Sequence, residues 1–252
     1  MRKLLSIVTI SIIATVLLTV GPVMAQKEYI NGIDANFPPF AYVDKNGVPA
    51  GFDVDAVNWI AKKLGFKVKH RPMEWSGIIA SLEAKKIDFI ASGLSVTEER
   101  AQKINYTIPY WKIRQVFVVK EDSLLTVDEI KTGRKLLGVQ SGTSEAKWLK
   151  DQAGKDGNNF SLHMYDSAPM AVEDLINGRV HAAAMNDAPA ADAVGKKPVK
   201  ILGTFGMEPE DFAYGVNKAD TELLEMLNKG IEMLMADPYW EQLVKKYEPG
   251  AH

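Results

Sequence analysis

The sequence predicts an α/β fold with two lobes, each built around a largely parallel sheet. Amphipathic helices alternate with short apolar strands, and polar loops follow the strands. One pattern also occurs twice: residues 82–91 and residues 175–184 each carry a helix end, a basic residue, a β-branched residue and an apolar strand. Many helix–strand junctions share this pattern, so a chance match is the alternative. A true repeat places a polar loop in each half at the carboxyl end of a strand, where open α/β sheets bind ligands.

Residues 1–25 are typical of a secretory signal peptide. Arg2 and Lys3 give a basic start, residues 4–20 are mostly apolar, and small residues precede Gln26. The apolar run is short for a membrane span, which needs about 20 apolar residues. We expect cleavage before Gln26, with an uncleaved anchor as the alternative. Because the chain has no cysteine, we expect an exported product without a lipid anchor.

The composition argues against several kinds of partner. Two of the 30 basic side chains lie in the signal segment, which leaves 28 against 32 acidic ones. Nucleic acid binding needs a clustered basic surface, so we expect none. The four histidines are scattered and there is no cysteine, so we expect no metal site, no cofactor and no disulfide. The fold must therefore rest on a hydrophobic core.

The first half of the mature chain contains two helix signals around a strand. The apolar residues of residues 53–64 recur at helical spacing, Asp53 is placed to cap the start, and Gly65 follows the end. Residues 87–91 form a short apolar strand, which a Ser-Gly loop follows. The Ser95-x-x-Glu98 spacing then resembles a capping box and predicts a further helix.

The second half continues the alternation. Residues 116–119 and 136–139 read as strands, and residues 180–185 lead into Asn-Asp-Ala-Pro. Two helices are predicted near the end of the chain. No long linker separates the halves, so the crossings between lobes must be short, near residues 110–115 and residues 206–214. Two crossing segments form a hinge.

Five segments, in order along the chain, resemble the periplasmic polar amino acid binding proteins of ABC importers (solute-binding protein family 3). They are Phe-Pro-Pro-Phe-Ala-Tyr at 37–42, Gly-Phe-Asp-Val-Asp-Ala at 51–56, Trp-Ser-Gly-Ile-Ile-Ala-Ser-Leu at 75–82, residues 86–100, and Pro-Tyr at 109–110. The lysine/arginine/ornithine, histidine and glutamine receptors are the most similar. The resemblance implies a type II periplasmic binding protein fold, with residues 26–111 and 213–252 in lobe 1, residues 112–212 in lobe 2, and a two-strand hinge.

The resemblance also implies how an amino acid is held. Arg100 matches the residue that clamps the α-carboxylate, and Ser95 and the N–H of Thr143 add donors at helix N-termini. Asp187 matches the carboxylate that holds the α-ammonium, assisted by the carbonyl of Gly93 in the Ser92-Gly93 loop. Taken singly, Arg100 has a surface ion pair as its alternative, Ser95 and Asp187 a helix cap, and Thr143 a turn.

Four further residues are expected to contact the ligand's side chain and select among amino acids. Phe37 and Trp75 match two aromatic walls, which suit a methylene stem and a charged tip, although strand aromatics are usually core. Asp34 would face the far end of the ligand, with an Asx turn ahead of Asn36 as its alternative. Ser144 stands where a longer amide is found in the basic amino acid receptors, and Gly93 where a serine is frequent.

The resemblance implies a monomeric, periplasmic, non-enzymatic receptor that delivers a polar L-amino acid to an ABC transporter permease by hinge closure. Arginine, lysine or histidine is expected first and glutamine next. The alternative is an enzyme on the same scaffold, similar to periplasmic cyclohexadienyl dehydratases, whose substrate carries two carboxylates that Asp34 and Asp187 would repel. A sensory domain ranks third, because the sequence shows no output domain.

Overall fold

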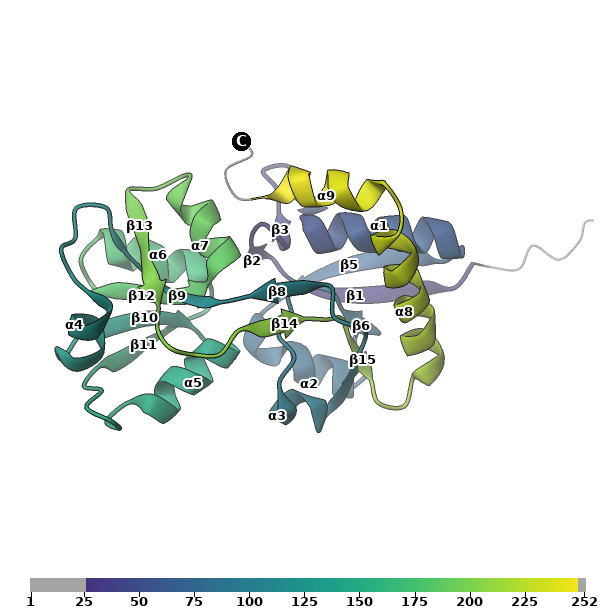
Figure 1. Ribbon diagram of the computed structural model, residues 1–252. Helices are drawn as coiled ribbons and strands as arrows, with labels where there is room; N and C mark the ends of the chain where they lie inside the picture. The colour runs from purple at the N-terminus through teal and green to yellow at the C-terminus, as the bar shows by residue number, and fades with distance from the viewer. Residues whose placement is uncertain (1–25, 249–252) are drawn as a thin grey trace, which may run out of the picture.

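Two five-stranded sheets lie side by side, each between layers of helices (Figure 1). The computed structural model describes residues 26–248, so the predicted signal peptide lies outside the described residues. Within the described range, no helix is long and apolar enough to cross a membrane. The predicted α/β class, with two sheets flanked by helices, is confirmed.

The first sheet is mixed, because one of its strands runs against the other four. β1 pairs in parallel with β5 and β6, whereas β15 pairs antiparallel with β6 and β7. In spatial order the strands are β5 (Lys67–Met73), β1 (Glu28–Asp34), β6 (Phe89–Ile90), β15 (Gly215–Asn217) and β7 (Ile104–Tyr106). The residue after β6 is fully buried, and the polar loop that follows begins at the carboxyl end of this central strand.

Helices cover both faces of the first sheet (Figure 1). α1 (Phe52–Leu64), α8 (Thr221–Met235) and α9 (Tyr239–Tyr247) share one apolar core, and the 3₁₀ turn η1 (Trp75–Gly77) and α2 (Ile78–Glu83) bury a second one on the other face. α1 ends as predicted at Gly65, whose left-handed φ of 78° favours glycine. A small sheet of β2 (Asn36–Phe37), β3 (Ala41–Val43) and β4 (Pro49–Ala50) lies beside α1.

Two predicted helix starts are wrong. α1 begins at Phe52 with Gly51 as its N-cap, and the Asp53 side chain accepts a hydrogen bond from the Gly93 N–H and makes no cap. α3 (Glu98–Ala101) is capped by Thr97, because Ser95 is held in an extended bridge to Phe212. Asp53 is thereby bonded to the loop of residues 92–97, to which Ser95 itself belongs.

The second sheet has the same general design. β10 pairs in parallel with β11 and β12, and β9 pairs antiparallel with β12 and β13. Its strands are β11 (Ser161–Tyr165), β10 (Leu136–Gln140), β12 (Ala182–Asn186), β9 (Gln115–Lys120) and β13 (Val199–Thr204). Its helices are α4 (Val127–Thr132), α5 (Ser144–Gln152), α6 (Ala168–Ile176) and α7 (Asp187–Val194). Separate apolar cores lie on its two faces, one packed under α6 and the other under α5.

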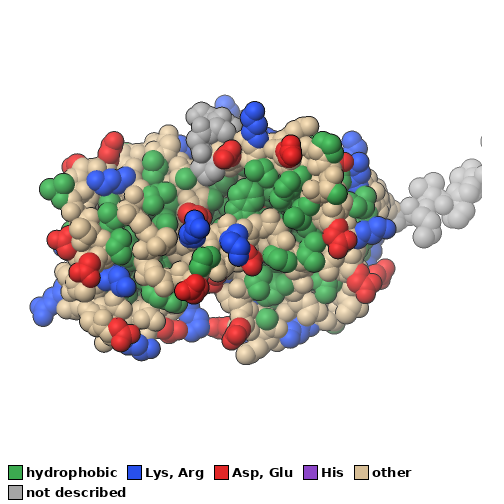
Figure 2. All heavy atoms as spheres, viewed as in Figure 1, with side chains coloured by type: hydrophobic (Ala, Val, Ile, Leu, Met, Phe, Trp, Pro, Cys, Tyr) green, Lys and Arg blue, Asp and Glu red, His purple; other side chains and the backbone are tan. Residues whose placement is uncertain are grey.

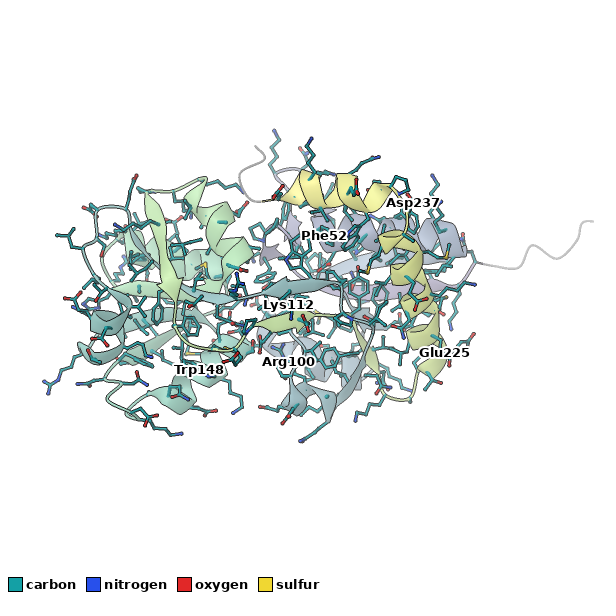
Figure 3. All side chains as sticks on the ribbon, in the orientation of Figure 1. Phe52, Arg100, Lys112, Trp148, Glu225 and Asp237 are labelled. Carbon is teal, nitrogen blue, oxygen red and sulfur yellow. The ribbon has the colours of Figure 1, made fainter. Side chains whose placement is uncertain are left out.

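Two strands run between the sheets as an antiparallel pair (Figure 1). They are β8 (Trp111–Ile113) and β14 (Glu210–Phe212), and Lys112 of β8, labelled in Figure 3, forms an ion pair of 3.0 Å with Asp211 of β14. Both segments fall where the crossings were predicted. The lobe boundaries and a hinge motion about this pair remain predictions.

We predict that Gly230→Val destabilises the part of the protein built on the first sheet, because α8 meets α1 at Gly230. A Cβ at Gly230 would lie 2.4 Å from Ile60 Cγ2 and 3.2 Å from Leu64 Cδ1. Overpacking of this kind costs about 1–3 kcal/mol. Lys229→Val, which introduces the same residue at the exposed neighbouring position, is the control for valine in α8 without overpacking. Urea unfolding should show the larger loss of unfolding free energy for Gly230→Val, and equal losses would contradict this packing.

Candidate functional site

The strand-end loops of the two sheets meet around one small cavity. Eight of the ten residues predicted from the sequence line it, together with three that were not predicted. The lining residues are Phe37, Trp75, Ser92, Gly93, Ser95, Arg100, Gln140, Thr143, Ser144, Glu145 and Asn186. Asp34 and Asp187, the two predicted carboxylates, are not among them.

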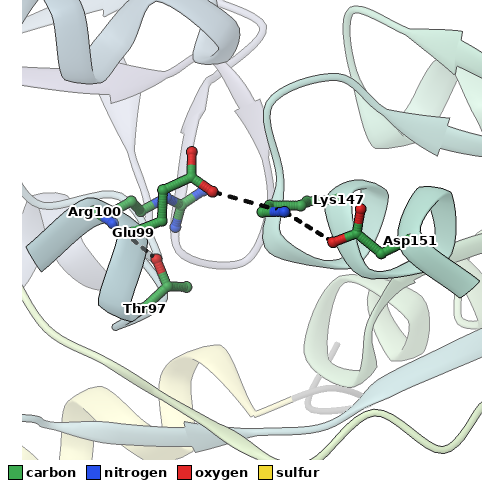
Figure 4. A network of polar contacts seen from close by, with 5 residues as sticks. All are labelled: Thr97, Glu99, Arg100, Lys147 and Asp151. Atoms are coloured by element: carbon green, nitrogen blue, oxygen red, sulfur yellow. Dashed lines mark hydrogen bonds and ion pairs between the residues drawn. The ribbon is translucent and has the colours of Figure 1, made fainter.

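We call the part of the protein built on the first sheet the first half and the part built on the second sheet the second half. Arg100 lies at the border between these two halves (Figure 3). Its backbone N–H is held by the Thr97 hydroxyl at 3.2 Å, as Figure 4 shows. The guanidinium donates to the Ser95 carbonyl at 3.0 Å and, across the cleft, to the Gly142 carbonyl at 3.0 Å. It also lies 5.6 Å from the centre of the Trp75 ring. A guanidinium has five N–H donors, so Arg100 retains donors for a carboxylate beside these two carbonyls.

Two aromatic rings form a flat apolar wall. Phe37 and Trp75 are nearly parallel, with an interplanar angle of 11° and ring centres 6.5 Å apart, and both are buried. Phe37 is held in place because it also packs against Phe40 and Phe212. Phe37 belongs to the apolar core under α1 and Trp75 to the core under α2, so the wall joins the two cores of the first sheet beside the cavity.

The loop after β6 fits tightly behind this wall. Gly93 has a left-handed φ of 58°, and a Cβ there would lie 2.4 Å from Phe37 Cε1. The absence of a serine at this position thus has a steric reason. The Gly93 N–H donates to Asp53 Oδ2 at 2.6 Å, and Ser92 Oγ accepts from the Asp34 N–H at 2.9 Å. Burial raises the pKa of Asp53 to about 7.

Asp34 is buried beside the cavity with both carboxylate oxygens engaged. Oδ2 accepts from Gln140 Nε2 at 2.7 Å and Oδ1 from the Asn36 N–H at 2.9 Å, the second contact being the expected Asx turn. Burial raises its pKa, against the effect of the Gln140 hydrogen bond. Because Gln140 ends a strand of the second sheet, this contact joins the two halves.

Asp187 is the first residue of α7 and is half-buried. Its Oδ1 accepts from the Ala188 N–H at 2.9 Å, and burial raises its pKa. The preceding residue, Asn186, lines the cavity, and within residues 26–248 its buried Nδ2 has no hydrogen-bond partner. At this strand end the cavity therefore receives an amide donor.

The N-terminus of α5 supplies the opposite side of the cavity. Thr143 Oγ1 caps the helix by accepting from the Ala146 N–H at 3.2 Å. The Ser144 hydroxyl donates to Glu210 Oε2 at 2.6 Å, and Glu145 lines the cavity beside it. Burial, with a smaller contribution from the charge of Glu210, raises the pKa of Glu145 to about 7.

The mouth of the cavity carries charges of both signs. Lys147 of α5 lies 3.9 Å from Glu99 of the first half and 2.8 Å from Asp151 (Figure 4). All three side chains are exposed, so each pair contributes little to stability. On the face seen in Figure 2, basic and acidic side chains are interspersed, with no block of one sign.

The residues missed from the sequence are neighbours of residues that were found. Gln140 and Glu145 belong to the same turn as Thr143, and Asn186 directly precedes Asp187. Their position after a predicted strand was the available signal. Which of two adjacent side chains faces the cavity depends on the strand register, which the sequence pattern leaves open.

The chain matches a family of known proteins over most of its length. The model of "Bacterial extracellular solute-binding proteins, family 3" matches residues 29–250. Two relatives are the L-cystine-binding protein TcyJ of Escherichia coli K12 (28% identical, 86% of this chain and 80% of the relative) and a probable histidine-binding protein of Campylobacter jejuni (31%, 86% and 83%). An ancestral arginine-binding protein bound to arginine is a structural neighbour, with a TM-score of 0.79, 35% identity, and coverage of 88% of this chain and 98% of that one. The type II periplasmic binding protein fold is thereby confirmed.

We predict that Gly93→Ala disturbs the cavity by displacing the Phe37 ring. Gly47→Ala is the matched control, because Gly47 has a φ of 79° and a Cβ added there would meet no other atom within 4 Å. Both variants carry the cost of a left-handed alanine, about 1–2 kcal/mol, and Gly93→Ala adds about 1–3 kcal/mol of overpacking. Denaturant unfolding measures the difference. Equal destabilisation of the two variants would show that the loop has room for a side chain.

Proposed function

This chain belongs to family 3 of the bacterial extracellular solute-binding proteins, and we propose that it captures a polar L-amino acid for an ABC importer. Arginine, lysine or histidine ranks first as the ligand and glutamine next. The supporting observation is that Arg100, the aromatic wall and the α5 N-terminus come together in one cavity from both halves of the chain. A forked cation beside flat apolar faces suits an amino acid carboxylate with an extended side chain.

In this proposal one set of residues binds the α-carboxylate and the α-ammonium of the ligand. Arg100 takes the α-carboxylate, with the Ser95 hydroxyl and the Thr143 N–H as further donors. The Gly93 carbonyl and Asp187 take the α-ammonium. The side chain then lies along Phe37 and Trp75, with Ser92 and Ser144 at its edges. For Asp34 to meet a ligand cation, the Gln140 amide at 2.7 Å must give way.

Export and delivery complete the proposal. Cleavage of residues 1–25 would release a monomer into the periplasm without a lipid anchor, and closure about β8 and β14 would present both lobes to a permease. Binding without catalysis is proposed, because a dicarboxylate such as prephenate would meet Glu145 on the cavity wall and Asp34 behind it. Formation of phenylpyruvate from prephenate by the purified protein would instead support the dehydratase alternative.

We predict that L-arginine, L-lysine or L-histidine gives the largest response in a thermal-shift screen of the common amino acids. A ligand at about 100 times its dissociation constant stabilises a protein by about 2.7 kcal/mol. Arg100→Ala should abolish that shift while the unliganded protein stays folded. Arg71→Ala is the matched control, since Arg71 also donates to a backbone carbonyl, that of Lys86, but lies outside the cavity. The site is misassigned if the Arg100 variant responds like wild type.

A further inference from the structure

Glu145 is a buried carboxylate on the cavity wall, and its hydrogen-bond partners are its own backbone N–H and the Ser144 hydroxyl. It is the second residue of α5, and 3% of its surface is exposed. Its contact with Ser144 Oγ is long, at 3.4 Å, whereas that hydroxyl is 2.6 Å from Glu210. A hydroxyl has one proton to donate, so the shorter contact takes it. Within residues 26–248, no Lys, Arg or His forms an ion pair with Glu145.

The other carboxylates around the cavity have partners. Asp34 is bonded by Gln140 and Asn36, and Asp187 by the Ala188 N–H. Glu210 accepts from Ser144 at 2.6 Å and from Gln115 at 3.0 Å. The Arg100 guanidinium is directed to two backbone carbonyls. Glu145 is therefore the cavity-lining carboxylate whose need for a cation is least met.

We propose that Glu145 is a further carboxylate that pairs with a cationic group of the bound amino acid, beside Asp187 at the α-ammonium or in place of Asp34 at the side chain, an inference that rests on the proposed function. A buried carboxylate without a cation is costly, and a ligand cation in the cavity would remove that cost. Arg100 and Glu145 together give the cavity one group of each sign, as a zwitterion requires. The ligand cation is either the α-ammonium or the tip of the side chain, and the experiment separates the two.

Cation binding at Glu145 has a consequence for pH dependence. The charged groups that face Glu145 are Glu210 and Arg100, and burial leaves its pKa at about 7. A bound cation favours the ionised form, so binding lowers this pKa and releases a proton. Affinity should then fall as the pH falls below about 7, by about tenfold between pH 8 and pH 6. Asp53 titrates in the same range but lies behind Gly93, so Glu145→Gln is needed to separate the two groups.

The test compares Glu145→Gln with wild type by titration calorimetry, using L-arginine and L-glutamine as probes. At pH 8 the variant should bind arginine at least about tenfold more weakly and should lose most of the pH dependence and the proton release, measured in buffers of different ionisation enthalpy. Glu121→Gln, on the exposed surface of the second half, is the matched control. Circular dichroism checks that each variant is folded.

Each outcome decides the proposal. Loss confined to arginine assigns Glu145 to the side-chain cation, and equal loss for both probes assigns it to the α-ammonium. Unchanged affinity and unchanged proton release would overturn the proposal, as would a loss seen only in Asp34→Asn. Failure of the proposed function is recognised separately, because wild-type protein would then bind neither probe nor any other amino acid in the thermal-shift screen.

Discussion

Arg100 is half-buried, and its guanidinium donates to carbonyl groups in both halves of the chain. The Ser95 carbonyl lies in its own half and the Gly142 carbonyl at the turn before α5. The Asp34–Gln140 contact at 2.7 Å is a second polar link across the cleft. Neither half satisfies these groups alone, so the two halves are held together by the same groups that surround the cavity. In the proposed function a ligand carboxylate would compete with these carbonyls for Arg100, and ligand binding would then be coupled to closure.

The sequence was most informative where a residue type has few alternatives. The resemblance placed Phe37, Trp75 and Arg100 on one cavity, and all three line it. The local sequence pattern was misleading for Asp53 and Ser95, because their positions near helix starts suggested helix caps. Local patterns weigh only neighbours along the chain, whereas Asp53 accepts from Gly93, forty positions away, and Ser95 pairs with Phe212. These long-range partners exist only once the first sheet has formed.

Asp34 shows the same limit at the level of the whole molecule. Its position after the Ile33 strand predicted a carboxylate that faces the far end of the ligand, and this stays a prediction. The structure buries Asp34 at the end of β1 and shows the Asx turn to Asn36 that was the alternative. Its contact with Gln140 could not be predicted, because that contact depends on how two sheets face each other. The lobe arrangement follows from β8 and β14, and neither strand carries a motif that specifies an orientation.

Several carboxyl groups around the cavity have pKa values raised by burial, among them Asp34, Asp53, Glu145 and Glu210. A carboxyl group whose pKa is higher in the folded state stabilises the fold below its unfolded pKa, and this stability is lost as the pH rises through the folded value. For Asp53 and Glu145 that loss is complete above about pH 7. The carboxylate of Asp53 accepts a hydrogen bond from the Gly93 N–H and so holds the loop after β6 in place. Glu145 holds no other segment, because its partners are its own backbone N–H and, at 3.4 Å, the Ser144 hydroxyl. This difference between two buried acids is why we propose a ligand cation as the partner of Glu145.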